Sequence, residues 1–412
     1  MFDALWDVAI VGGGPSGLAL ATALKHQGVD KVVVLEREVS AGGVPRHCGH
    51  YPFGIVEFHR LMKGPAYAER HVACARAAGV VIATAATVLA ITPGGQLHVT
   101  SDEGVGTLSA RRIALCTGAR EASRAQRFIG GPRQRGVVTT GALQSLVYLE
   151  GLTPFRRPVI LGTELVSFSS ILTCRHAGIK PVAMVEPTPK LVARAFAGGL
   201  PALLGIEVVL GAQVRRIVGN AQVEGVEITT HDGKTRTLEA DGVICTGAFR
   251  PEAALMRCGH IAVDDATGGP VIDQYGRSSD PAVFCAGNLL RPIETSAWCA
   301  REGQEAAQRI AGDLAAGHTA HQPVQTSLQI AHEAISYCVP QRLSRGGAGG
   351  AMTHAQIRLS RPARGRLHAT VAGRSVWSMK VNSRPERRIL APLEPITRFA
   401  DAGPIKMTFE ER

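Results

Sequence analysis

Residues 7–17, DVAIVGGGPSG, decide the first part of the fold. An apolar run typical of a buried strand ends in the turn Gly12–Gly17, which has the spacing GxGxxG. Residues 18–28 then predict a helix that stops at Gly28, and the apolar run 31–35 predicts a second strand that ends at Glu36. A strand, a glycine turn, a helix and a second strand with an acidic end are the context that makes this pattern a dinucleotide fingerprint.

Each glycine in such a turn has a physical task. Gly12 permits the tight turn, Gly14 lets the backbone approach a pyrophosphate, and Gly17 lets the helix pack closely on the strand. The amino end of the helix presents free N–H groups and a positive dipole to the phosphates. Glu36 would then accept a hydrogen bond from a ribose hydroxyl. The alternative, a tight turn that holds no ligand, is disfavoured by this context.

A second alternation of strand and helix begins near the middle of the chain. Residues 157–162 (RPVILG) predict a strand and a turn, residues 167–178 a helix, and residues 180–187 (KPVAMVEP) another strand. Two further strands end in Thr-Gly turns, at Thr117-Gly118 and Thr246-Gly247. The turn AGN at 286–288 precedes a helix predicted over 295–314, and residues 355–412 predict short strands.

Composition excludes several classes of protein. The 412 residues are 45% hydrophobic, too apolar for a disordered chain, yet no apolar run reaches the roughly 18 residues of a membrane span. The first residues lack a basic region and a cleavage site, so we expect no secretory signal. Nine scattered cysteines without CxxC or CxxxxC spacing exclude a zinc finger and an iron–sulfur cluster within this chain. We therefore expect no metal site, a reducing compartment and a cytoplasmic location.

Positive charge is concentrated at the end of the chain. Residues 321–412 hold 14 Lys and Arg against 6 Asp and Glu, whereas residues 1–320 hold 31 against 28. The excess indicates either an Arg-rich surface without a partner or a docking surface for an acidic partner. Peripheral association with a membrane stays open. Nucleic acid is not an expected partner, because the basic positions are not interleaved with stacking aromatic residues.

These motifs, in this order, resemble the two-dinucleotide-binding-domain flavoproteins of the pyridine nucleotide–disulfide oxidoreductase superfamily. The resemblance covers about residues 5–320. It implies an α/β fold with two Rossmann-like three-layer domains. Residues 1–122 and 270–320 would form a discontinuous FAD-binding domain, residues 123–269 an NAD(P)-type domain, and residues 321–412 a basic β-rich extension.

The resemblance also implies which residues hold FAD. The ADP half would lie on the first glycine turn and the end of the second strand, and the flavin half would lie at the AGN turn and at the amino end of the helix that follows it. The implied cofactor-binding residues are Gly12, Gly14, Pro15, Ser16, Gly17, Glu36, Arg37, Gly43, Val88, Thr117, Gly118, Gly287, Asn288, Thr295 and Ser296. The helix dipole at Thr295 would favour the negative charge of reduced flavin.

Two departures from the family pattern concern binding. Asn288 stands where the family usually has Asp, so a hydrogen bond to a hydroxyl is retained without the charge. In the second turn, Glu164 and Ser167 replace the second and third glycines. A carboxylate there would face and repel a pyrophosphate, and Glu186 at the end of the next strand would not compensate. We therefore expect no tight binding of NAD(P).

The third departure is that the CxxxxC redox disulfide is missing. The segment 41–54 (AGGVPRHCGHYPFG) stands in its place and offers Arg46, His47, Cys48 and His50 as catalytic candidates. Arg46 could stabilise an anion, and either histidine could shuttle a proton near neutral pH. Cys48 could be a reactive thiol if its neighbours lower its pKa, but a small buried packing residue is the favoured interpretation. For the two histidines, a role in hydrogen bonding within the loop is weighted equally with a role in proton transfer.

The sequence favours an FAD-dependent oxidoreductase. The segment 41–54 is similar to flavoprotein subunits associated with glycerol-3-phosphate-type, opine or amino-acid dehydrogenases. We therefore expect an electron-transferring subunit of a multi-subunit dehydrogenase for a small polar metabolite. Its partners would be a small iron–sulfur protein and a second dehydrogenase subunit. The alternatives are a stand-alone NAD(P)H-dependent flavin reductase, a single-cysteine peroxide reductase that uses Cys48, and a non-catalytic assembly subunit that keeps the flavin fold.

Overall fold

The computed structural model describes residues 2, 4–193, 198–317, 325–344 and 350–412. Contacts divide the chain into two compact units, each of which is described by itself. The first unit comprises residues 1–43, 68–119 and 250–412, and the second comprises residues 44–67 and 120–249. Among the described residues, no helix is both long enough and apolar enough to cross a membrane.

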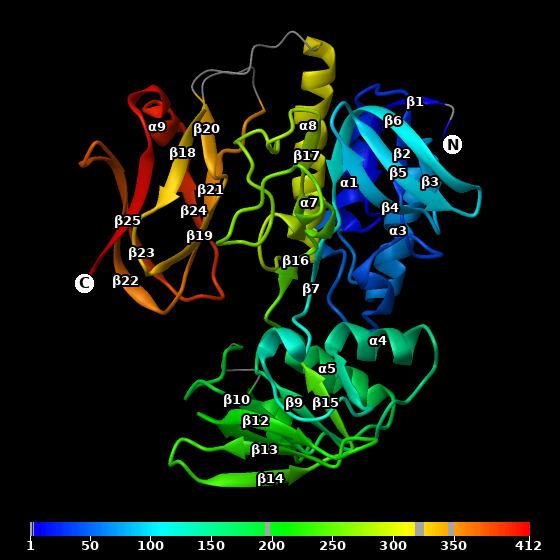
Figure 1. Cartoon of the computed structure of the whole chain (residues 1–412), viewed down its shortest axis with the longest axis vertical. Helices are drawn as coiled ribbons and strands as arrows, with labels where there is room; N and C mark the ends of the chain where they lie inside the picture. The colour runs from blue at the N-terminus through cyan, green and yellow to red at the C-terminus, as the bar shows by residue number, and fades with distance from the viewer. Residues whose placement is uncertain (1, 3, 194–197, 318–324, 345–349) are drawn as a thin grey trace. The chain divides into compact units, whose positions relative to one another are not determined.

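A seven-stranded sheet forms the centre of the first unit (Figure 1). Its strand order is β3-β2-β1-β6-β5-β4, and β17 pairs with the last residues of β6 in parallel. The strands are β1 (Leu5–Val11), β2 (Val32–Leu35), β3 (Val81–Ala83), β4 (Thr87–Thr92), β5 (Gln96–Ser101), β6 (Gly104–Leu115) and β17 (Val283–Cys285). Strands β1, β2, β3, β6 and β17 run parallel, whereas β4 and β5 form an antiparallel meander.

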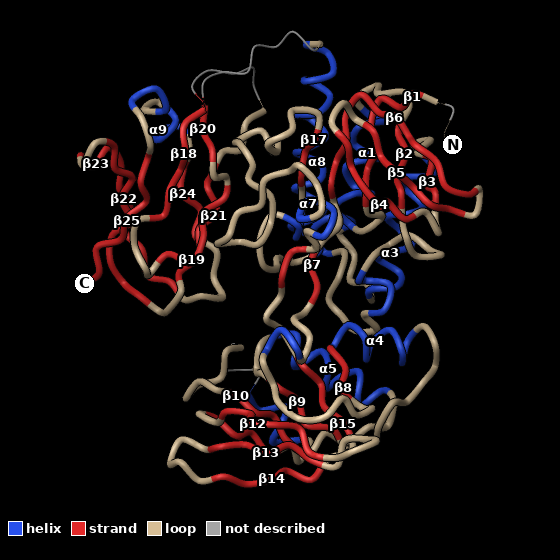
Figure 2. The backbone as a smooth tube through the Cα atoms, viewed as in Figure 1, coloured by secondary structure: helices blue, strands red, loops and turns tan. Residues whose placement is uncertain are grey.

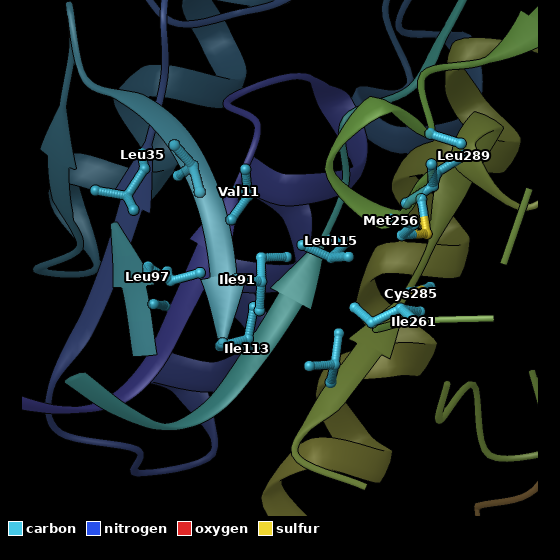
Figure 3. Close-up of a cluster of buried hydrophobic side chains, with 14 of the residues drawn as sticks. Val11, Leu35, Ile91, Leu97, Ile113, Leu115, Met256, Ile261, Cys285 and Leu289 are labelled. Carbon is cyan, nitrogen blue, oxygen red and sulfur yellow. The ribbon is translucent and has the colours of Figure 1, made fainter. Parts of the chain in front are cut away.

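Both faces of the parallel strands are covered. The helices α1 (Pro15–His26) and α8 (Ser296–Ala316) pack over one face around a core that includes Leu18, Leu24 and Ile310. On the other face, side chains of the parallel strands meet those of the meander, as Figure 3 shows for Val11, Leu97 and others. Because every residue of β2 is buried, its sequence is the continuous apolar run that parallel strands require.

The first unit also contains most of α3 (Gly64–Ala77), together with α7 (Ala254–Arg257) and the 3-10 helix η4 (Gly287–Leu289). Strands β7 (Ala119–Arg120) and β16 (Arg250–Pro251) lie where the chain passes from one unit to the other.

The second unit repeats the plan with a five-stranded parallel sheet of order β11-β10-β9-β15-β8. A three-stranded antiparallel sheet, β12-β13-β14, shares one apolar core with it, and α4 and α5 contribute to the core on the other face. The strands are β8 (Val137–Thr139), β9 (Pro158–Leu161), β10 (Ala183–Glu186), β11 (Glu207–Leu210), β12 (Gln213–Val218), β13 (Gly225–Thr229), β14 (Thr235–Glu239) and β15 (Gly242–Cys245). The helices are η1 (Val44–His47), α2 (Ile55–Phe58), η2 (Ala125–Arg127), α4 (Thr140–Tyr148), α5 (Leu165–His176) and α6 (Gly199–Leu203).

The C-terminal region belongs to the first unit but has its own β-rich core (Figure 2). A five-stranded sheet of order β20-β18-β25-β22-β23 accompanies a three-stranded antiparallel sheet of order β19-β21-β24. The elements are β18 (Gln325–Ile330), β19 (Ile335–Val339), β20 (Arg342–Ser344), β21 (His354–Leu359), β22 (Ala363–Val371), β23 (Arg374–Ser383), β24 (Ile389–Pro392), α9 (Glu394–Thr397), η5 (Ala400–Ala402) and β25 (Ile405–Glu411).

The predicted fold class, an α/β fold with two Rossmann-like three-layer domains and a β-rich extension, is confirmed. The predicted helix over 295–314 is α8, which begins one residue later and ends two residues later. The predicted second strand–helix–strand unit is β9, α5 and β10.

The packing of α8 on α1 generates a prediction about stability. A Cβ atom at Gly303 of α8 would lie 2.1 Å from the carbonyl oxygen of Ser16, so Gly303→Ala must push the helices apart. We expect it to lower the free energy of unfolding by about 1–3 kcal/mol. Gly312 lies in the same helix with nothing within 4 Å of its Cβ position, so Gly312→Ala should raise that free energy by roughly 0.5–1 kcal/mol. Urea denaturation followed by circular dichroism measures both, and two equal effects would contradict the close approach.

Candidate functional site

Three turns of the first unit follow the carboxyl ends of neighbouring parallel strands. They are the glycine turn after β1, the Thr117-Gly118 turn after β6 and the Gly287 turn after β17. Since ligands of open α/β sheets bind outside the carboxyl ends of the strands, this edge is the candidate site.

Among the glycines of the turn after β1, only Gly14 has open space at its Cβ position. A Cβ atom at Gly17 would lie 2.0 Å from the carbonyl oxygen of Gly12, and Gly12 itself has a φ of +108°. At Gly14, by contrast, the nearest atom to a Cβ would be the Cα of Gly43 at 3.9 Å. Gly14 is also the N-cap of α1 and makes no side-chain cap. The first N–H groups of α1 are therefore offered, next to an open position, to an external acceptor.

Glu36 is anchored at the end of β2. Its side chain is buried, and its Oε2 accepts the N–H of Gly13 at 2.9 Å while its Oε1 accepts the N–H of Glu38 at 3.0 Å. A carboxylate has about four acceptor sites, so each oxygen can accept a further hydrogen bond from a ribose hydroxyl. The neighbouring Arg37 is largely exposed and lies 3.6 Å from Glu38.

The turn after β17 packs directly against the start of α1. Gly287 has a φ of +77°, and a Cβ atom there would lie 2.8 Å from the Cβ of Ser16. Asn288 turns its amide toward the backbone of Glu294, which engages both its oxygen and its nitrogen. Thr295 is the N-cap of α8, where its Oγ1 accepts the N–H of Trp298 at 3.4 Å, and Ser296 is the first residue of the helix.

The other residues that the resemblance implies lie in the same unit with different surroundings. Pro15 opens α1, and Ser16 is buried with its hydroxyl 3.6 Å from the Sγ of Cys116. Thr117 donates its hydroxyl to the carbonyl of Glu252 at 2.8 Å. Val88 belongs to β4 of the meander, and its side chain is buried in the apolar core.

The corresponding turn of the second unit is filled by its own carboxylate. Ser167 Oγ and Thr246 Oγ1 each lie 3.1 Å from Glu164 Oε2. A Cβ atom at Gly162 or at Gly247 would lie 2.4 Å or 2.3 Å from a carboxylate oxygen of Glu164. The group therefore occupies the space between the turns after β9 and β15. Burial raises the pKa of Glu164, and its hydrogen bonds oppose that shift.

Glu186, at the end of β10, is likewise engaged within the second unit. It is buried, and its carboxylate accepts hydrogen bonds from the hydroxyl of Thr163 at 2.7 Å and from the N–H and hydroxyl of Thr188 at 3.1 and 2.9 Å. These three hydrogen bonds use most of the acceptor capacity of the carboxylate that would bind the ribose of a nicotinamide nucleotide.

The four catalytic candidates lie together in the second unit. Arg46 and His47 end η1 and are half-buried, Cys48 follows them, and His50 lies 2.9 Å from the carbonyl of Tyr51. Cys48 Sγ lies 3.4 Å from the carbonyl of Val44 and 3.6 Å from Oε1 of Gln144 in α4. Burial, with a smaller contribution from the charge of Glu121, raises the pKa of Cys48 to about 12. The thiol is thus held in its unreactive protonated form.

Glu121 is a residue that sequence reasoning missed. Its buried carboxylate accepts the N–H of Gly141 at 2.8 Å and the N–H of Gly247 at 3.0 Å, and it thereby joins the start of α4 to the turn after β15. Burial raises its pKa. The only local signal is its position three residues after Gly118, which carries no chemistry by itself.

A doubly wound unit with an open glycine turn, followed by a second unit of the same plan, defines a two-dinucleotide-binding-domain oxidoreductase. Residues 6–311 match the model of the pyridine nucleotide-disulphide oxidoreductase family, and the chain belongs to that family. It is an FAD-dependent oxidoreductase, as predicted.

Individual relatives are distant. One subunit of the opine oxidase of Rhizobium meliloti (strain 1021) is 24% identical over 63% of this chain and 56% of its own length. The alpha subunit of sarcosine oxidase from the same organism is 25% identical over 75% of this chain and 30% of its own length. The chain thus spans about half, or less, of these curated relatives. Thioredoxin reductase of T. acidophilum shares the fold, with a TM-score of 0.63 at 22% identity over 75% of this chain and 99% of its own.

The first unit fits FAD on its own geometry. The position of Gly14 is open, the first turn of α1 is uncapped by any side chain, and Glu36 is fixed with acceptor capacity to spare. Together they match a pyrophosphate and a ribose.

The open position at Gly14 gives a prediction about cofactor binding. Gly14→Glu should leave the fold intact but abolish FAD binding, because a side chain and a negative charge would enter the space for the pyrophosphate. Absorption at the flavin bands of the purified protein measures occupancy, and circular dichroism checks the fold. Gly312→Glu, at an exposed position of α8 with nothing within 4 Å of its Cβ, is the matched control and should retain FAD. A fully flavinylated Gly14→Glu variant would refute the site.

The raised pKa of Cys48 gives a prediction about thiol chemistry. Because burial raises the pKa of Cys48, its thiol stays protonated at pH 8, so alkylation by iodoacetamide should be far slower than at the exposed Cys258. Mass spectrometry of tryptic peptides over time compares the two sites in one sample. Cys48→Ser should also keep FAD and most of the turnover. Rapid labelling of Cys48, or complete loss of turnover with normal flavin content, would make it catalytic.

Proposed function

We propose that this chain is the electron-transferring flavoprotein subunit of a multi-subunit dehydrogenase that acts on a small polar metabolite. The observation that carries the proposal is the contrast between the two turns. The first is open at Gly14, whereas the second is filled by the carboxylate of Glu164. A chain that binds FAD but has lost its nicotinamide site must exchange electrons with something other than NAD(P)H.

Bound FAD would supply two-electron redox chemistry at the strand edge of the first unit. In this proposal, the N–H groups at the start of α1 hold the pyrophosphate, and Glu36 orients the ribose. Gly287 lets the ribityl chain approach the backbone, and the amino end of α8 at Thr295 favours negative charge on the flavin ring. Arg46, His47 and His50 remain the proposed groups for anion binding and proton transfer.

The proposed partners are a small iron–sulfur protein and a second dehydrogenase subunit. The relatives from opine oxidase and sarcosine oxidase are both subunits by name, which supports an assembly. The outward side of the five-stranded C-terminal sheet supports an acidic partner. On β22 alternate residues are buried, which leaves Arg364 and Arg366 outward, and Lys380 of β23 and Lys406 of β25 are exposed on neighbouring strands.

The binding of NADH and NADPH tests whether the carboxylate of Glu164 blocks the second turn. We expect NADH and NADPH to bind with dissociation constants of about 1 mM or weaker, equivalent to about −4 kcal/mol or less favourable, because Glu164 occupies the phosphate space. Calorimetric titration of the flavin-loaded protein measures the constants. Glu164→Gly should tighten binding only modestly, since Glu186 stays engaged by Thr163 and Thr188. Micromolar binding by the unmodified chain would overturn the proposal in favour of an NAD(P)H-dependent reductase.

Purification from native cells tests the assembly. We expect a yellow protein that co-purifies with at least one further chain and that is not bleached by stoichiometric NADH. A yellow protein without partners that NADH bleaches rapidly would indicate the stand-alone reductase. A colourless chain that takes up no added FAD would indicate a non-catalytic role in assembly.

A further inference from the structure

The side-chain amide of Asn288 joins the two ends of the loop that connects β17 to α8. Asn288 Oδ1 accepts the N–H of Glu294 at 2.7 Å, and Asn288 Nδ2 donates to the carbonyl of Glu294 at 3.1 Å. The loop lies between Gly287 and Thr295, the two positions at which the proposed function places the flavin half of FAD. Whatever fixes Glu294 therefore fixes both ends of this loop.

Two arginines hold Glu294 in place: one lies in the three-stranded sheet β19-β21-β24, which is called the C-terminal sheet below, and the other directly precedes β24. Arg358 of β21 donates through its Nη2 to Oε1 of Glu294 at 2.8 Å and to the carbonyl of Ile293 at 2.8 Å. Nη1 of Arg388, which precedes β24, lies 3.8 Å from Oε2 of the same carboxylate. The Glu294 side chain is only 9% exposed, so the carboxylate is held between two guanidinium groups with little water around it.

A second contact joins the same sheet to the start of α8. Arg291 is fully buried and donates to both carboxylate oxygens of Glu302 and to the carbonyl of Gly287. Gln356 of β21 donates to the same carboxylate at 2.8 Å. Arg388 lies over the ring of Trp298, 3.9 Å from its centroid.

These contacts are costly if their only role is stability. Burying charged pairs costs free energy of desolvation, and apolar side chains of similar size commonly give equal or greater stability. What ion pairs with two or three fixed hydrogen bonds provide is a defined geometry. Here the geometry is that of residues 287–302, and the side chains that define it come from residues 356–388, far along the chain.

We propose that the C-terminal sheet positions bound FAD, with Arg358 as the positioning residue that acts through Glu294 on the loop 287–295. This inference rests on the proposed placement of the flavin at Gly287 and Thr295. It assigns a task to the basic C-terminal region besides docking, since Arg358 and Arg388 point into the protein rather than toward a partner.

The test begins with Arg358→Gln in the full-length chain. We expect the dissociation constant of FAD to rise by about tenfold, because a charge-assisted hydrogen bond to the loop is lost. Fluorescence titration of the apoprotein with FAD measures it. Arg358→Lys keeps the charge but cannot reach both Glu294 and Ile293, so it should give a smaller rise of about threefold.

The midpoint potential of the flavin is a readout that a merely structural role would not move in a defined direction. Arg358→Gln leaves the negative charge of Glu294 beside the start of α8 with only the more distant Arg388 to balance it, so the potential should become more negative. Glu294→Gln removes that charge and should make the potential more positive. Spectroscopic titration against reference dyes measures both shifts.

A double-mutant cycle shows whether Arg358 acts through Glu294. The two substitutions together should weaken FAD binding no more than the weaker-binding single variant does. Arg361→Gln is the matched control, because Arg361 pairs with Glu411 on the exposed side at 2.6 and 2.7 Å, and it should change FAD binding by less than about twofold.

The outcomes separate the two proposals. An unmodified chain that binds no FAD overturns the proposed function itself. Normal FAD binding by that chain, with Arg358→Gln unchanged in affinity and potential, overturns the positioning role alone. Should Arg358→Gln fail to fold, Arg358→Lys decides: an unaltered FAD affinity and potential in that variant would also overturn the role.

Discussion

The structure of the first unit depends on one steric constraint, the direct contact of backbone with backbone around the start of α1. A Cβ atom would lie 2.0 Å from the Gly12 carbonyl at Gly17, 2.8 Å from Gly14 at Gly43, and 2.1 Å from Ser16 at Gly303. Each contact excludes every residue except glycine. Together they fix where α1 begins, and so where its free N–H groups point, and they bring α8 against the same end. A site for a pyrophosphate follows from this packing before any polar side chain is considered.

The two units show how one side chain changes the use of the same turn. At the amino end of α1, the position after the first two glycines is open, so the helix dipole is available to an external anion. At the amino end of α5, Glu164 is the N-cap and its own carboxylate occupies the space. The helix dipole favours negative charge there, whereas burial of the Glu164 carboxylate opposes it and raises its pKa. In the second unit, the carboxylate of Glu164 therefore takes the place at the helix amino end that a ligand phosphate would take in the first unit.

The local parts of the fold could be predicted from sequence, and the long-range contacts could not. The glycine turn, the strand at 31–35, the strand and turn at 157–162 and the helix that starts near Thr295 are encoded within a few neighbouring residues, and their type was predicted correctly. The orientation of Glu164 into its turn depends on Ser167 and on Thr246, which is 82 residues away. The pair of Arg358 with Glu294 joins positions 64 residues apart, and neither residue has a motif that marks it. Side chains that act across such distances reveal their partners only after folding.

The same electrostatic reasoning connects the two carboxylates that precede helices. Glu164 stands at the N-cap position of α5 and fills its turn without a side-chain cap, whereas Glu294 directly precedes Thr295, the residue whose hydroxyl caps α8. A carboxylate at that position is drawn toward the positive end of the helix dipole, as at α5. Arg358 supplies the competing attraction, and the carboxylate binds its guanidinium at 2.8 Å. The amino end of α8 is thereby left to an external group, and the proposed function places the flavin ring there. In this proposal, Arg358 of the C-terminal sheet keeps the Glu294 carboxylate away from the amino end of α8, whereas in the second unit the carboxylate of Glu164 fills the turn before α5.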